Sequence, residues 1–179
     1  MKYISILRGI NVSGRQKIKM LDLKVLYETL GFQNVVTYIQ SGNVVFDSND
    51  KKISEITIKI ENAISRKYKF AVPVQIRTKN DFQKIIKDIP FGSVDLVEEG
   101  TKVLVTFLSE KPDKEKITAI EEFVISPERL VVKGKHVYLY CPNGYGKSKL
   151  LNTFLENKLG VVATTRNWKS VSKLHEMAV

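Results

Sequence analysis

The sequence contains very few of the residues that build disulfides, metal centres and histidine-dependent catalytic sites. Among 179 residues there are one cysteine, Cys141, and two histidines, His136 and His175. A lone cysteine excludes an internal disulfide and a cysteine-cluster zinc site. Two histidines far apart in the sequence argue against a metal centre or a histidine-dependent triad. We therefore expect no metal and no cofactor, and we expect Cys141 to pack in an apolar strand.

The sequence also lacks long apolar runs. No run approaches the ~20 residues that a membrane-spanning helix needs. The apolar run at the N-terminus is too short for a signal peptide and has no small-residue cleavage site. Hydrophobic residues make up 43% and charged residues 27% of the chain, as in an ordinary globular protein. We expect a cytoplasmic protein with no membrane association, and the sequence leaves its oligomeric state open.

Acidic residues are scarce at the two ends of the chain. The formal net charge is +10, and residues 1–19 contribute +5, residues 129–179 contribute +7 and the segment between them contributes −2. This asymmetry favours an anionic partner, either nucleic acid or a phosphorylated small molecule, although a basic surface also serves solubility alone.

Hydrophobic periodicity predicts two halves with the same order of elements. The first half is expected to contain a strand (2–7), a helix (20–30), two strands of a tight hairpin around Gly42 (34–40 and 43–47), a helix (52–67) and a strand (72–77). The second half is expected to contain a strand (102–108), a helix after Asp113, two hairpin strands around Gly134 (129–133 and 136–141), a helix ending at Gly160 and a strand (161–165). A linking helix capped by Asn80 and a terminal helix (168–178) capped by Asn167 complete the prediction.

This order of elements is that of the ferredoxin-like βαββαβ plait. We predict an α/β (α+β) fold with two tandem plaits: residues 1–79 form the first ferredoxin-like half, residues 80–100 a linking helix and acidic loop, and residues 101–179 the second half with a terminal helix. No residue-level repeat is present, so the duplication rests on element order alone. In the strand over 136–141, Val137, Leu139 and Cys141 should face the helices, and the tyrosines of its other face are expected to pack one sheet against the other.

Four motifs occur in a fixed order along the chain. They are Leu7–Val12 (LRGINV), Tyr38–Phe46 (YIQSGNVVF), Gly144–Leu150 (GYGKSKL) and Thr164–Trp168 (TTRNW). Together they resemble the bacterial domain-of-unknown-function family sixteen ninety-seven (DUF1697), over about residues 2–175. The resemblance implies a double ferredoxin-like fold and implies no activity. Members commonly carry a second glycine where this chain has Ser13, which argues against a glycine cradle in the first motif.

The predicted topology places two of these motifs side by side. In a sheet with strand order 4-1-3-2, the end of the first strand lies beside the start of the third. Arg8 and Asn11 then lie next to Gln40, Ser41 and Asn43. One interpretation is structural, with the polar side chains completing the turn. The other is an anion or amide site, with Arg8 as a bidentate donor and Gln40 and Asn43 adding hydrogen bonds.

The second predicted cluster combines Lys147 and Ser148 with Arg166, Asn167 and Trp168. A strand, a Gly-Lys-Ser sequence and a helix are the setting of a P-loop, but the first glycine of that pattern is missing. We expect a phosphate site at a helix N-terminus near Lys147, and the alternative is a glycine turn that leads into an amphipathic helix. Trp168 is expected to anchor the last helix or to line this cluster.

These features predict an uncharacterised bacterial protein that acts as an anion-binding or nucleic-acid-binding α/β module. The alternative is an enzyme or sensor that acts on a small phosphorylated ligand, held by Arg8 and Asn43 or by Lys147 and Arg166. No residue is assigned to catalysis.

Overall fold

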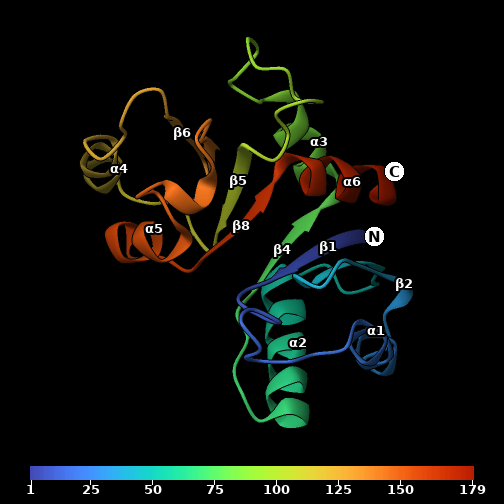
Figure 1. Cartoon of the computed structure of the whole chain (residues 1–179). Helices are drawn as coiled ribbons and strands as arrows, with labels where there is room; N and C mark the ends of the chain where they lie inside the picture. The colour runs from blue at the N-terminus through green and yellow to red at the C-terminus, as the bar shows by residue number, and fades with distance from the viewer. The chain divides into compact units, whose positions relative to one another are not determined.

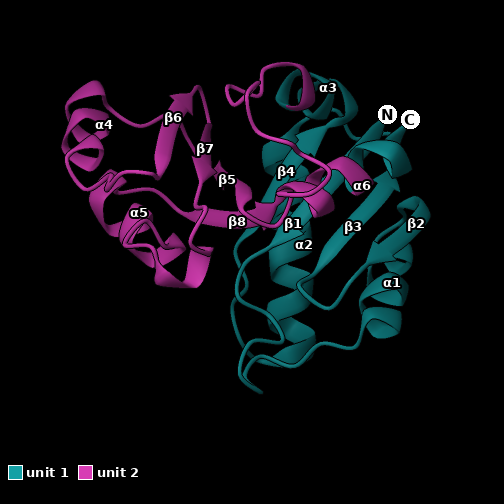
Figure 2. Cartoon of the chain, turned by 45° about the horizontal axis from the view of Figure 1, so that its top comes forward, with its two compact units in different colours: residues 1–85, 174–179 teal, residues 86–173 magenta.

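The computed structural model describes all of residues 1–179 and contains two four-stranded antiparallel sheets and six helices. The chain divides into two compact units (Figure 2). Unit 1 comprises residues 1–85 and 174–179, and unit 2 comprises residues 86–173. The divisions fall inside α3 (Lys79–Lys87) and α6 (Trp168–Ala178). None of the helices combines the length and the apolar composition that a bilayer crossing requires.

Unit 1 contains one complete ferredoxin-like plait (Figure 1). Its strand order is β2-β3-β1-β4, which is the predicted order, and every neighbouring pair is antiparallel. Its elements are β1 (Lys2–Leu7), α1 (Met20–Thr29), β2 (Gln33–Tyr38), β3 (Asn43–Asp47), α2 (Ile53–Tyr68) and β4 (Val74–Thr78).

The core of unit 1 follows from the alternation of side chains along its strands. On β1, Tyr3 and Leu7 join a cluster with α1 and α2, which lie on the same side of the sheet (Figure 1). On α2, buried isoleucines recur every four residues, at positions 56, 60 and 64. Each such side chain contributes about 1.5–3 kcal/mol when it is fully removed from water. This cluster fixes the sheet and both helices that frame the site described below.

Unit 2 repeats the plait with strand order β6-β7-β5-β8. In the predicted manner, Val137, Leu139 and Cys141 join the core formed with α4 and α5. The packing of sheet against sheet through the tyrosines stays a prediction. The elements of unit 2 are β5 (Val103–Leu108), α4 (Lys114–Glu121), β6 (Arg129–Lys133), β7 (His136–Tyr140), a 3₁₀ turn η1 (Tyr145–Lys147), α5 (Asn152–Leu159) and β8 (Ala163–Asn167).

The start of α5 differs from the prediction. The helix begins at Asn152 instead of near Lys147, and the chain before it is extended at Ser148 and Leu151. The Ser148 hydroxyl accepts a hydrogen bond from the Leu150 N–H at 3.0 Å. This local bond satisfies a backbone donor outside a helix, so it competes with an earlier helix start. The predicted helix N-terminus at Lys147 is therefore wrong.

Of the two asparagine caps predicted for α3 and α6, the structure confirms one. The prediction that Asn80 caps α3 is wrong, because Thr78 and Asp81 exchange hydrogen bonds of 2.8 Å and 3.1 Å across the first turn, as in a capping box. The Asn167 cap of α6 is confirmed, since its Oδ1 accepts the Ser170 N–H at 2.9 Å. The preceding strand ends at Asn167, two residues later than predicted.

Candidate functional site

The turn of the β2–β3 hairpin lies against the connection that follows β1. The Leu7 N–H donates to the Gly42 carbonyl at 2.8 Å. Gly42 has φ +82°, and a Cβ there would lie 2.5 Å from Cδ1 of Ile10 and 3.0 Å from Cβ of Leu7. Both the left-handed backbone and the close approach therefore require glycine. The motif glycine holds the hairpin tip in contact with the residues after β1.

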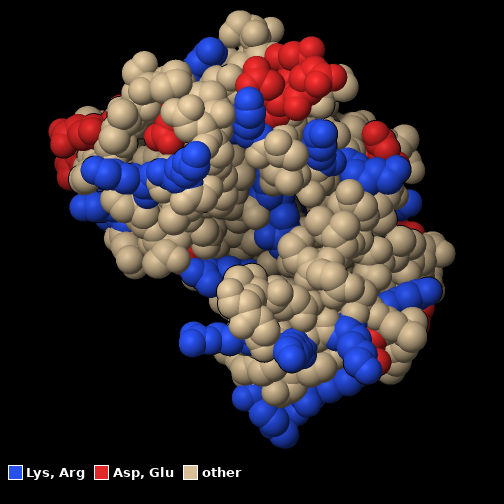
Figure 3. Space-filling view, viewed as in Figure 1, with Lys and Arg blue, Asp and Glu red and all other residues tan.

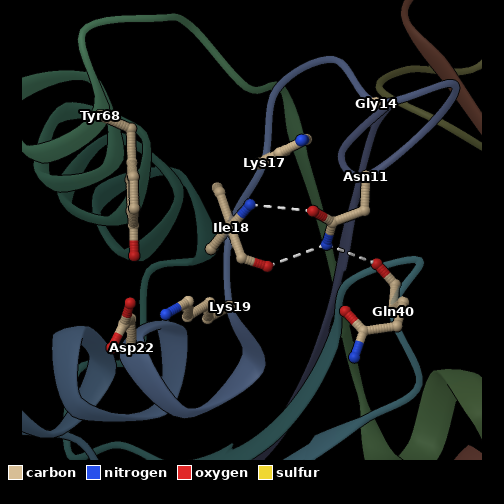
Figure 4. Close-up of a pocket in the computed structure, with 8 residues that line it drawn as sticks. All are labelled: Asn11, Gly14, Lys17, Ile18, Lys19, Asp22, Gln40 and Tyr68. Carbon is tan, nitrogen blue, oxygen red and sulfur yellow. Dashed lines mark hydrogen bonds between the residues drawn. The ribbon is translucent and has the colours of Figure 1, made fainter.

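Asn11 ties this connection together. We call residues 8–19, between β1 and α1, the basic loop. The Asn11 amide donates to the carbonyls of Ile18 and Gln40 at 2.9 Å each, and its Oδ1 accepts the Ile18 N–H at 2.9 Å (Figure 4). Its φ of +56° is a conformation that asparagine tolerates better than most residues. One side chain thus closes the basic loop on itself and attaches it to the hairpin.

Ser41 and Asn43 make the turn itself. Asn43 is fully buried, and its amide donates to the Tyr38 carbonyl at 3.0 Å and to the Ser41 hydroxyl at 3.1 Å. These contacts support the structural interpretation for both residues. Arg8 is half-buried, and its backbone N–H donates to the Pro73 carbonyl at 2.9 Å. The role of its guanidinium toward an anion stays a prediction.

Beside the Asn11 clamp lies a cavity of about 530 Å³, which we call the unit 1 cavity. It is bounded by the basic loop, the start of α1, the hairpin turn and the last residue of α2 (Figure 4). Its volume falls in the range of small-molecule sites. Its lining residues are Asn11, Gly14, Lys17, Ile18, Lys19, Asp22, Gln40 and Tyr68.

Tyr68 contributes an unpaired group to this cavity. Its hydroxyl is buried without a hydrogen-bond partner and points toward Asp22 (Figure 4). Burial, with the negative charge of Asp22 as the smaller cause, raises the pKa of Tyr68, so the hydroxyl stays a donor at neutral pH. The ring stacks on Phe70 with centroids 5.9 Å apart, and the Lys67 ammonium lies 5.5 Å from its centroid. These contacts fix the direction in which the hydroxyl points.

The N-terminus of α1 also opens on the unit 1 cavity. The residue before the helix is Lys19, which is extended and provides no side-chain cap. The first N–H groups of a helix have no acceptor within the helix, and together with the helix dipole they favour an anion. Lys17 and Lys19 are exposed on the cavity lining, while Asp22 in the first turn adds one negative charge. The lining therefore combines cationic, acidic and neutral hydrogen-bonding groups.

Positive charge continues beyond the cavity. Figure 3 shows Lys and Arg side chains gathered where unit 1 carries the last turn of α2. Arg15 in the basic loop and Arg66, Lys67 and Lys69 at the end of α2 are exposed. This end of unit 1 therefore presents a cationic surface around the cavity.

The second predicted cluster, in unit 2, is arranged differently from the expectation. The Tyr145 hydroxyl donates to the Thr165 hydroxyl at 3.4 Å, and Thr165 donates to the Asn152 side chain at 3.0 Å. Arg166 follows Thr165 on β8, so it points to the opposite face of the sheet. Its guanidinium is buried and donates to the Thr165 carbonyl at 2.9 Å. Burial lowers the pKa of Arg166 to about 10. The loop that carries Lys147 thus meets Thr165, and an anion site at Arg166 stays a prediction.

The remaining residues of this cluster make structural contacts. Ser148 is buried, and besides its bond to Leu150 it hydrogen-bonds the Cys141 thiol, whose pKa burial raises to about 11. Trp168 is buried at the start of α6, directly after the Asn167 cap. A cavity of about 560 Å³ beside the loop is lined by Ile125, Ser126, Glu128, Asn143, Lys147 and Lys149. No three His, Cys, Asp or Glu side chains are grouped as a metal site requires.

Sequence reasoning identified Asn11 and Gln40 but missed the other four lining residues with polar side chains. Lys17 and Lys19 carried a signal, because two lysines stand just before a helix whose start has no Ser, Thr, Asp or Asn cap. Asp22 resembled an ordinary first-turn acid. Tyr68 carried no signal, since it lies far along the chain from the basic loop and reaches the cavity only through the packing of α2.

Comparison with known proteins agrees with this fold. The family model described as "Protein of unknown function (DUF1697)" matches residues 1–138. Among solved structures, the conserved bacterial protein SP0830 from Streptococcus pneumoniae is similar to this chain, with a TM-score of 0.79 and 27% sequence identity over 99% of this chain and 98% of that chain. No curated protein matches.

Proposed function

Because the chain belongs to the DUF1697 family of proteins of unknown function, its role has to be argued from its own site, and we propose that unit 1 binds a small phosphorylated ligand in the cavity beside Asn11. One observation carries this proposal. A cavity of ligand size is lined by Lys17 and Lys19 at the uncapped start of α1. Cationic side chains and free helix N–H groups are the two features that phosphate sites in proteins combine.

The Asn11 clamp supports the same proposal. A flexible loop that becomes ordered on binding loses conformational entropy, and this loss weakens affinity. Three hydrogen bonds of 2.9 Å already hold the basic loop at both of its ends. Lys17 and Lys19 are therefore presented from a backbone that is ordered before the ligand arrives, and only their own side chains need to be fixed.

Isothermal titration calorimetry with inorganic phosphate at low salt tests the proposal. We expect saturable binding, and we expect Lys17→Ala and Lys19→Ala each to weaken it about fivefold, since a lost charge-assisted contact of about 1 kcal/mol corresponds to that factor. Lys51→Ala is the matched control. Lys51 is exposed and precedes α2, whose 16 residues separate it from Tyr68 by roughly 24 Å of helix. Absent binding at millimolar phosphate, or equal weakening by Lys51→Ala, contradicts the proposal.

A second candidate function is the binding of single-stranded nucleic acid. The Lys and Arg side chains gathered at this end of unit 1 favour it, because cationic side chains contact the phosphate backbone of a nucleic acid. Fluorescence anisotropy with a short labelled oligonucleotide would then show affinity that falls as salt rises. Arg66→Ala and Lys69→Ala would weaken the oligonucleotide without changing the affinity for inorganic phosphate. Undetectable binding at low salt excludes this candidate.

The same phosphate titration tests the two arginines that the sequence predicts as anion ligands. If Arg8 or Arg166 holds the anion, its substitution by alanine lowers phosphate affinity and leaves the fold intact. If the substitution instead unfolds the protein, as measured by circular dichroism, the arginine has a structural role. Arg166 is the stronger case for a structural role, because its side chain is buried.

A further inference from the structure

The unit 1 cavity has two chemically different parts, and from them we infer that its ligand is a phosphorylated polyol of the sugar-phosphate class, whose hydroxyl group bridges Tyr68 and Asp22. This inference rests on the proposed function, because it assigns the phosphate to Lys17 and Lys19. It adds the identity of the neutral part of the ligand.

The buried Tyr68 hydroxyl is the first observation. A buried donor without a partner is rare in proteins, because its lost hydration is not replaced. Phe70 and Lys67 hold the ring, so the hydroxyl stays directed toward Asp22 (Figure 4). A ligand oxygen between these two residues would accept the missing hydrogen bond.

Asp22 is the second observation. Its carboxylate makes no ion pair with Lys17 or Lys19, although both line the same cavity. An ionised carboxylate only accepts hydrogen bonds. Figure 4 shows the Lys19 side chain extended toward Asp22. The Asp22 carboxylate is therefore available to accept a hydrogen bond from the ligand, and the flexible Lys19 side chain can turn toward the phosphate.

A hydroxyl is the smallest common functional group that satisfies both residues through a single atom. A hydroxyl accepts from Tyr68 and donates to Asp22, whereas an ammonium group donates to Asp22 but has no lone pair for Tyr68. A second phosphate would be repelled by the Asp22 carboxylate. A nucleobase would need an aromatic face to stack on, and the Tyr68 ring is engaged by Phe70 and Lys67. The cavity volume of about 530 Å³ accommodates a monosaccharide phosphate.

Calorimetry with a set of matched ligands tests this inference. The probes are inorganic phosphate, glucose 6-phosphate, glucose, phosphoethanolamine and AMP. We expect glucose 6-phosphate to bind about tenfold more tightly than inorganic phosphate, as one added hydrogen bond to a charged group predicts. Glucose alone is expected to bind far more weakly than either, and phosphoethanolamine and AMP no more tightly than inorganic phosphate.

Two conservative variants locate the effect in the cavity. Tyr68→Phe should remove the advantage of glucose 6-phosphate, and Asp22→Asn should reduce it, because the asparagine oxygen still accepts a hydrogen bond but carries no charge. Neither variant should weaken inorganic phosphate. Glu28→Gln is the control, because it removes the same charge at the other end of α1, where Glu28 makes only an exposed ion pair with Lys24 at 3.8 Å. It should leave both affinities unchanged.

The outcomes separate this inference from the proposed function. If inorganic phosphate binds at Lys17 and Lys19 but glucose 6-phosphate gains nothing, or its gain survives Tyr68→Phe and is not reduced by Asp22→Asn, the inference is wrong and the proposed function stands. Tighter binding of phosphoethanolamine or AMP than of glucose 6-phosphate also overturns the inference. If no phosphate compound binds at millimolar concentration, the proposed function fails as well.

Discussion

The two units share one strand order, but each lengthens a different connection between strand and helix. In unit 1 the long connection is the basic loop, residues 8–19, and the corresponding segment of unit 2 is only residues 109–113. In unit 2 the long connection is residues 141–151, after β7, and its counterpart in unit 1 is residues 48–52. Each unit's cavity is lined in part by its own long connection. The two sheets have the same topology, and the candidate sites lie in the loops whose lengths differ between the units.

The two loops also differ in how completely their polar groups are satisfied. In unit 2, Tyr145, Thr165 and Asn152 form a chain of hydrogen bonds, and Ser148 is paired with Leu150. In unit 1, the basic loop is anchored by Asn11, yet the Tyr68 hydroxyl beside it has no partner, and Tyr68 lines the cavity. An unpaired donor beside an anchored loop favours a ligand site in unit 1 over one in unit 2.

The largest expected effect compares the two hairpin glycines. Gly42→Ala should lower the free energy of unfolding by about 3 kcal/mol, because it adds overpacking against Ile10 and Leu7 to the cost of a left-handed backbone. Gly134→Ala at the corresponding turn of unit 2 should cost only about 1 kcal/mol, since φ is +58° but no atom lies within 4 Å of the added Cβ. Urea unfolding followed by circular dichroism measures both. Equal losses would show that the hairpin tip of unit 1 is not pressed against the basic loop.

Asn11→Ala should have the next largest effect. It removes three hydrogen bonds and places alanine at φ +56°, so we expect a loss of about 2 kcal/mol together with weaker phosphate binding. Asn152→Ala is the counterpart in unit 2, where Asn152 also bonds two partners. It should destabilise by about 1 kcal/mol and leave phosphate binding unchanged. A loss of phosphate binding in Asn152→Ala would break the assignment of the site to unit 1.

Removal of the Tyr68 hydroxyl should stabilise the ligand-free protein. An unpaired buried donor is unfavourable, so Tyr68→Phe should raise the free energy of unfolding by up to about 1 kcal/mol. Tyr140→Phe in unit 2 should lower it, because the Tyr140 hydroxyl donates to Glu99 at 2.9 Å. Thermal unfolding of the two variants under identical conditions compares them. Destabilisation by Tyr68→Phe would mean that its hydroxyl has a partner in solution.

The smallest effect concerns Cys141, at the start of the long connection of unit 2. Burial raises the pKa of this thiol to about 11 from 9.0, so it is protonated in the folded protein at pH 8 and should not react with a thiol reagent until the protein unfolds. Because the folded pKa is the higher one, this contribution to stability is complete below pH 9.0 and is lost as the pH rises toward about 11. Rapid reaction of the native protein at pH 8 would show that this loop is open.

Much of the fold is predictable because its signals are local. Alternating apolar residues defined the strands, and Gly31 and Gly160, both at positive φ, followed the ends of their helices. The repeated order of strands and helices then gave the strand order of both sheets. Asn167 was recognisable as a cap from its place before an apolar helix.

The parts that escaped prediction depend on contacts between distant segments. Side chains alternate between the two faces of β8, so either Thr165 or Arg166 faces the loop that carries Lys147, and the structure shows that it is Thr165. The predicted strand ends two residues too early, so the prediction does not include Arg166 in this alternation. Ser148 delayed the start of α5 through a bond to Leu150. Tyr68 reaches the cavity only because α2 packs beside the basic loop, so no pattern near residues 8–19 indicates it.

The most direct test of the central claim is a titration of the ¹⁵N-labelled protein with inorganic phosphate, followed through its backbone amide chemical shifts. If the unit 1 cavity is the anion site, the amides of residues 17–22 and of Gln40 shift in a saturable manner, and those of residues 143–149 do not. Shifts centred on residues 143–149, or no saturable shift in either unit, would contradict the account.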